Sequence, residues 1–164
     1  MKVVAAVLAW IVLVIASLYL LPTSHAAEEP RTYTEAEAEV IRAELAELYS
    51  ALERSTHVTP EAYPDLQFLN HEALERTTGI HNALLKGFYR DGIIYLDNQI
   101  DLRTPMGISI ILHELVHHFQ FAKAGPAKDC DEWQQREQFA YAEQQRFLSA
   151  QGIMFSVPQQ PLCL

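Results

Sequence analysis

Basic residues are scarce in this chain. It has 12 lysines and arginines against 21 aspartates and glutamates, which gives a formal net charge of −9. Because nucleic acids are bound through clustered Lys and Arg side chains, this balance argues against a nucleic-acid partner. Internal repeats and low-complexity tracts are also lacking. Apolar residues make up 49% of the 164 positions, which predicts one packed domain and not wholesale disorder.

Cysteine is almost absent, with only Cys130 and Cys163 in the whole chain. A zinc site built on thiolates would need more cysteines or a nearby partner, so that kind of site is disfavoured. In an oxidising compartment the default expectation for such a pair is a disulfide. On the chain-entropy model this disulfide would contribute roughly 3–4 kcal/mol of stability. It would tie the C-terminal tail back to the start of the last predicted helix.

The N-terminus carries a long apolar run without a single charge. Lys2 precedes it, the run extends over residues 3–21, and Pro22 ends it. Ser24-His25-Ala26 then offers small residues at the −3 and −1 positions of a cleavage site. Residues 1–26 are therefore predicted to be a signal peptide, or an uncleaved N-terminal membrane anchor, since the run is long enough to cross a bilayer. Either way residues 27–164 are expected to be exported, periplasmic or secreted, and to meet a membrane only through this segment.

Capping signals and apolar periodicity predict an α+β domain. Thr34-Glu35-Ala36-Glu37 has capping-box spacing ahead of an amphipathic pattern, and Thr104-Pro105 combines a cap with proline at the first helical position. Asp91-Gly92 between two β-prone runs predicts a hairpin. Together these signals predict a small antiparallel sheet with helices before and after it. The expected elements are a helix over 34–55, a short strand near 66–68, a short helix over 70–78, hairpin strands over 88–90 and 93–96, and helices over 104–123 and 131–150.

The pattern His113-Glu114-Leu115-Val116-His117 lies within one of these predicted helices. Residues four apart share a helix face, so His113 and His117 can direct ring nitrogens at one ion. Glu114 can then reach a water on that ion and act as general base. Zinc accepts imidazole ligands and lowers the pKa of its water to near neutrality. His118 falls away from the pair and is expected to be a surface or packing histidine.

Two histidines and a water leave zinc one protein ligand short. Glu137 in the last predicted helix shares its face with mostly apolar residues, where burial of a carboxylate is costly unless a metal ion or a partner compensates it. Glu137 is therefore the expected third ligand. The alternative is a rim glutamate paired with an arginine. The residues that share this face are Trp133, Ala140, Tyr141, Gln144, Phe147 and Leu148.

The spelling HELVHHFQ, followed by Glu137 twenty positions after His117, resembles the gluzincin pattern of zinc metallopeptidases. With the later cysteine and a Glu-x-x-Ala-Tyr-x-x-Gln segment, it also resembles a group of small exported bacterial zincin-like proteins. The resemblance covers residues 104–148 and, more loosely, the predicted hairpin. It implies a zincin-like single domain over 27–164, with His113, His117 and Glu137 as Zn2+ ligands, Glu114 as general base and a peptide or protein as substrate. It also implies that the substrate lies along an edge strand, for which residues 93–96 are the candidate.

Three functions remain open from the sequence. The first is a zinc-dependent peptidase of the cell envelope. The second is a catalytically inactive zincin-like envelope protein with a structural or partner-binding role, because the chain has no room for the second domain that walls the cleft of larger gluzincins. The third is metal storage or delivery, and the ligand set also suits other divalent ions. The group that would stabilise an oxyanion is open among Tyr89, Tyr95, Tyr141 and His81.

Overall fold

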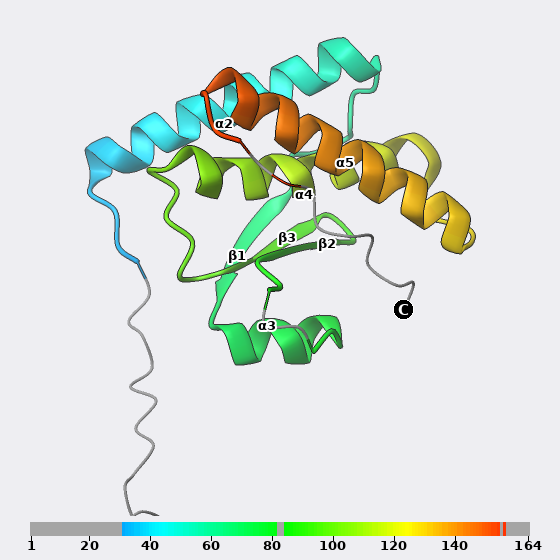
Figure 1. The fold of residues 1–164 in the computed structure, drawn as a ribbon, viewed down its shortest axis with the longest axis horizontal. Helices are drawn as coiled ribbons and strands as arrows, with labels where there is room; N and C mark the ends of the chain where they lie inside the picture. Colours follow the sequence, from blue (N-terminus) through cyan, green and yellow to red (C-terminus); the bar gives the residue numbers. More distant parts are fainter. Residues whose placement is uncertain (1–30, 82–83, 155, 157–164) are drawn as a thin grey trace, which may run out of the picture.

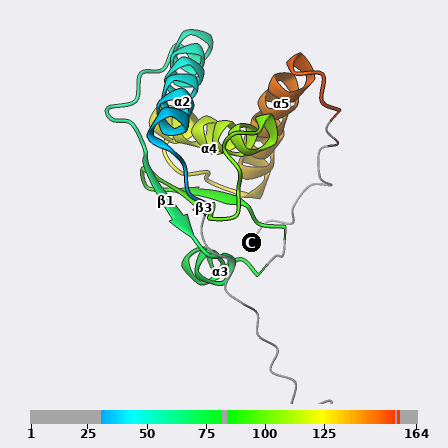
Figure 2. The same ribbon diagram turned by 90° about the vertical axis from the view of Figure 1, so that its left-hand side faces the viewer.

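The computed structural model describes residues 31–81, 84–154 and 156. These residues form an α+β domain with four helices and three strands, and the predicted fold class is confirmed at this level. Helices α2, α4 and α5 lie on one side of the sheet, and α3 lies on the other side (Figures 1 and 2). The elements, in chain order, are α2 (Glu35–Thr56), β1 (Asp65–Leu69), α3 (His71–Thr78), β2 (Gly87–Arg90), β3 (Ile93–Asp97), α4 (Pro105–Ala124) and α5 (Cys130–Ala150).

The helix boundaries follow the capping signals. The Thr34 side chain accepts a hydrogen bond from the Glu37 amide, and the Glu37 carboxylate accepts one from the Thr34 amide, which completes the predicted capping box of α2. Thr104 caps α4, and proline follows at the first helical position. Asp129 caps α5 by accepting from the Glu132 amide. The helices therefore begin and end within one or two residues of their predicted limits.

The sheet is mixed, so the predicted antiparallel sheet is wrong. Its strand order is β1-β3-β2, with β2 antiparallel to β3 and β1 parallel to β3. The predicted hairpin of β2 and β3 is present, and Asp91 and Gly92 both have positive φ, of 49° and 83°, as its two-residue turn requires. A parallel pair instead needs a crossover connection, which α3 and β2 supply between β1 and β3. Strand 93–97 is consequently central, and β2 is the edge strand beside α4.

Helix α4 runs through the middle of the hydrophobic core. It packs against α2, α5, β2 and β3. The side chains of Ile94 and Leu96 on β3 are fully buried beneath it, and Ile108, Ile111 and Phe119 contribute its own buried face. A helix enclosed in this way holds its remaining, largely buried side chains at fixed positions, which is what a binding site on the helix needs.

Two sequence-based expectations concern residues outside the described part of the chain. The predicted signal or anchor, residues 1–26, lies there, and so does Cys163, so the export segment and the Cys130–Cys163 disulfide stay predictions. Within residues 31–81, 84–154 and 156, no helix combines the length and the apolar character that a membrane span requires.

Candidate metal centre

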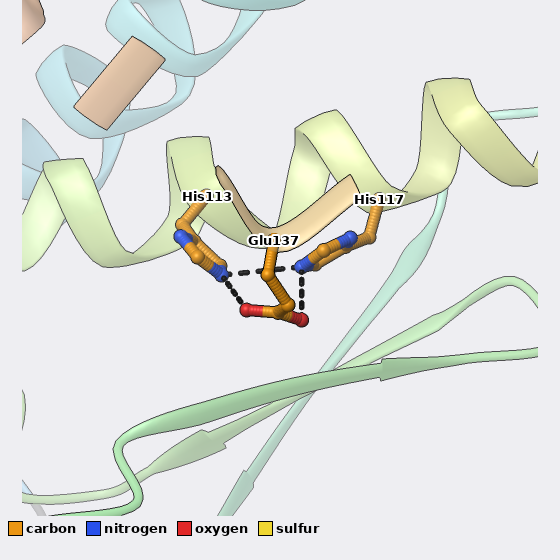
Figure 3. Close-up of side chains that lie close together, drawn as sticks. All are labelled: His113, His117 and Glu137. Carbon is orange, nitrogen blue, oxygen red and sulfur yellow. Dashed lines mark hydrogen bonds and ion pairs between the residues drawn. The ribbon is translucent and has the colours of Figure 1, made fainter. Parts of the chain in front are cut away.

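His113, His117 and Glu137 converge on one point between α4 and α5 (Figure 3). The Nε2 atoms of the two histidines are 3.1 Å apart. Glu137 places Oε1 3.1 Å from Nε2 of His117 and Oε2 3.4 Å from Nε2 of His113. The three side chains are only 10–16% exposed. This arrangement could hold a metal ion, and within the described residues no other group of three His, Cys, Asp or Glu side chains meets the same distance test.

The electrostatics of this cluster fit a cation. Burial by itself raises the pKa of the Glu137 carboxyl, but hydrogen bonds to His113 and His117 outweigh it and bring that pKa to about 2. Burial lowers the pKa of His117, whereas the nearby carboxylates of Glu137 and Glu114 raise it, and the net direction is upward. A buried carboxylate and two facing imidazoles therefore require positive charge between them, either as a proton or as a metal ion.

Gln120 orients the second histidine. Its Oε1 lies 2.9 Å from His117 Nδ1, and because an amide oxygen only accepts, Nδ1 carries the proton and Nε2 presents its lone pair to the cluster. The amide nitrogen of Gln120 donates to the backbone carbonyl of Arg136 at 3.1 Å, which fixes the amide in this orientation. Arg136 in turn donates to the carbonyl of Gly125 and to the Glu132 carboxylate. Only the fold shows this link, because the carbonyl that holds the Gln120 amide belongs to α5.

We expect Gln120→Leu to weaken metal binding about 10- to 100-fold, the usual effect of losing a partner that orients a metal-binding histidine. Gln138→Leu is the matched control, because Gln138 is exposed on α5. Titration of both variants with a divalent metal by calorimetry measures the effect. Equal affinities in the two variants would show that Gln120 does not orient His117.

The first histidine is held by packing. Its ring lies 4.8 Å from the His117 ring and 4.4 Å from the Tyr141 ring, measured between centroids. Its Nδ1 atom is the one buried side-chain polar atom without a hydrogen-bond partner in the described part of the chain. His118 does not join the cluster. It lies 3.0 Å from the Ala62 carbonyl and 3.2 Å from the Tyr89 hydroxyl, as expected of a packing histidine.

Glu114 lies between α4 and the edge strand. It is 6% exposed, and burial raises the pKa of its carboxyl despite the nearby histidines. The Tyr89 backbone amide offsets a small part of this rise, and the Glu114 side chain packs against Gly87. Glu114 is therefore held at the junction of α4 and β2, beside the histidine cluster.

The structure separates the four candidates for an oxyanion donor. Tyr89 is engaged, because its hydroxyl accepts from the Gly92 amide at 3.0 Å and contacts His118. Tyr95 alternates along β3 with Ile94 and Leu96, which face α4, so it belongs to the other sheet face. His81 is 78% exposed and pairs with Glu75. Tyr141 lines the cavity at the site, and its hydroxyl has no hydrogen-bond partner among the described residues.

A cavity of about 890 Å³ opens beside the cluster. Strand β2, helix α4 and helix α5 form most of its wall, and His113, Glu114, His117 and Glu137 all line it. Much of the remaining wall is apolar. Its larger apolar side chains are Ile80, Leu84, Leu85, Phe88, Ile100, Met106, Ile110, Phe121 and Trp133. A molecule in this cavity would contact both the cluster and the edge strand.

Comparison with known families gives one match. Residues 37–163 match the family described as Domain of unknown function (DUF6647). The chain belongs to this family. Comparison with curated proteins and with solved structures gives no match. The DUF6647 match includes α4 and α5 in full, so the whole histidine and glutamate cluster lies inside the family's domain.

Proposed function

We propose that this DUF6647 protein is a zinc-dependent peptidase with a zincin-like fold. One observation carries the proposal: His113, His117 and Glu137 converge at a cavity that Glu114 also lines. A storage site would need the three ligands alone. A hydrolase needs in addition a carboxylate next to the ion and space for a substrate, and both are present here.

Zinc is the proposed metal because two imidazoles and one carboxylate are a common zinc donor set that leaves a coordination position open. A bound zinc ion supplies a Lewis acid and lowers the pKa of a coordinated water to near 7. His113, His117 and Glu137 would hold this ion at the cavity. Glu114 takes a proton from the attacking water and later passes it to the leaving amine.

The proposed substrate is an extended peptide that pairs with β2. The candidate strand from sequence, residues 93–96, is central and has no free edge, whereas β2 pairs with no strand other than β3 among the described residues. The Asp97 amide donates to the Lys86 carbonyl, so along the antiparallel pair Gly87 and Tyr89 direct their N–H and C=O groups to the open edge. That edge borders the cavity, where a peptide main chain would lie next to the cluster.

Tyr141 is the proposed donor to the oxyanion that forms on the peptide carbonyl. It follows Glu137 by one helical turn on α5, and its ring packs against His113 at a tilted angle of 59°. Burial, together with the charges of Glu137 and Glu114, raises the pKa of its hydroxyl to about 12, so the hydroxyl keeps its proton at neutral pH.

We expect Tyr141→Phe to lower kcat about 10²- to 10³-fold, the range seen when one oxyanion donor is removed. Metal content and KM should change little, since the ring that packs on His113 is retained. Tyr95→Phe is the control, because Tyr95 lies on the far face of the sheet. Steady-state kinetics on one peptide would measure the fall in kcat. An unchanged kcat in Tyr141→Phe would remove Tyr141 from the mechanism.

The proposed location is outside the cytoplasm, because residues 1–26 have the organisation of an export signal or anchor. The substrate would then be a peptide or protein of the cell envelope.

The experiment that tests this function is cleavage of an unbiased peptide library by the purified, zinc-loaded protein. Hydrolysis that stops with a chelator and returns with zinc supports the proposal. A folded, zinc-loaded protein that cleaves no peptide contradicts it and favours the inactive zincin-like scaffold with a partner-binding role.

A further inference from the structure

Gly87, the first residue of β2, lies directly against the proposed general base. A Cβ atom at this position would lie 2.7 Å from Glu114 Oε1, 3.0 Å from Glu114 Cγ and 3.1 Å from Ile110 Cγ2. Non-bonded carbon atoms are normally separated by at least about 3.5 Å. Glu114 can therefore occupy its place only because residue 87 has no side chain.

The backbone conformation does not explain this glycine. Gly79, Gly92, Gly125 and Gly152 have φ values of 70–83°, where glycine is favoured, and a Cβ there would meet nothing within 4 Å. Gly87 lies in a regular strand outside that φ range. A glycine inside a strand ordinarily weakens it, so its presence indicates a close approach by another group.

The approaching group lies beside the open edge of the same strand. Gly87 and Tyr89 both direct their backbone groups to that edge, and the Tyr89 amide is near enough to the Glu114 carboxylate to lower its pKa in part. Gly87 leaves the space that the Glu114 side chain occupies. The close approach at this one position therefore sets how near the carboxylate lies to the edge of β2.

We propose that Gly87 is a positioning residue for Glu114, an inference that rests on the proposed function. Any side chain at position 87 displaces the Glu114 carboxylate from the edge of β2. Because the closest atom is the free end of a flexible side chain, the carboxylate moves while the fold persists. The expected consequence is loss of turnover without loss of metal.

A double-mutant cycle on stability tests the contact without any activity assay. Gly87→Ala is measured in the parent protein and in a Glu114→Ala background, by denaturant unfolding with zinc present. In the parent we expect a lower midpoint denaturant concentration. In the Glu114→Ala background the two shortest contacts are gone. There Gly87→Ala should leave the midpoint unchanged or raise it, because alanine is normally more stable than glycine within a strand. The same change in both backgrounds would overturn the inference.

Kinetics test the consequence. We expect Gly87→Ala to lower kcat about 10- to 100-fold, the effect of displacing a catalytic group by about 1 Å, with KM and zinc content close to the parent values. Gly152→Ala is the control, because it strains a left-handed glycine that is not part of the cavity wall and should lower stability while kcat is kept. An unchanged kcat in Gly87→Ala would overturn the inference. A parent without hydrolysis would instead contradict the proposed function, and the stability cycle would still decide whether Gly87 positions Glu114.

Discussion

Glu114→Gln is expected to lower kcat for peptide hydrolysis by about 10²- to 10⁴-fold, the usual contribution of general acid–base catalysis. Glutamine keeps the size of the side chain and can still accept hydrogen bonds through its amide oxygen. It cannot take a proton from water at neutral pH. Since Glu114 is not part of the convergent cluster, zinc content should remain the same as in the parent.

The control for this result is Glu47→Gln, which removes an exposed carboxylate from α2 and should leave kcat unchanged. Zinc per chain, measured by elemental analysis on each protein, separates loss of the base from loss of the metal. Full hydrolysis by a zinc-loaded Glu114→Gln variant would remove Glu114 as the base. Loss of zinc from that variant would mean that Glu114 belongs to the ligand set.

Zinc is expected to stabilise the folded protein strongly. A ligand that binds only the native state contributes about 4 kcal/mol at a free concentration 1,000 times its dissociation constant. For a domain of this size that corresponds to a rise in Tm of roughly 8–16 °C. The physical reason is that the ion replaces a proton between the buried carboxylate of Glu137 and two imidazoles that already lie within 3.1–3.4 Å of one another.

Calorimetric scans with zinc and with a chelator measure this shift. His113→Ala, His117→Ala and Glu137→Ala should each lose most of the shift, because each removes one of three converging side chains. His81→Ala is the control, since His81 is 78% exposed and outside the cluster. A parent protein whose Tm is the same in zinc and in chelator would show that the cluster binds no zinc, and the partner-binding alternative would then be favoured.

Local signals were sufficient to predict the helices and the positions of the site residues along them. Helix limits depend on side chains within three or four residues, such as Thr34 with Glu37, so the sequence contains all the information that they need. The histidine spacing likewise follows from the 3.6-residue helical repeat, and His113 and His117 share a face as expected. The mostly apolar face of its helix predicts Glu137 as the third side chain of the cluster, and Glu137 lies against both histidines.

Strand pairing and the partners of the site residues were decided by the tertiary structure alone. Nothing in residues 65–69 indicates that β1 pairs in parallel with β3, because that pairing depends on a crossover through α3. The pairing makes β3 the central strand and leaves β2 at an edge of the sheet. The link from Gln120 to His117 and Arg136 and the approach of Gly87 to Glu114 join elements that no local rule connects. By itself, then, the sequence determined which side chains share each helix face, through short-range geometry. Only the packing of α4 against α5 and β2 decided what those faces meet, since such contacts depend on how distant elements fill space around one core.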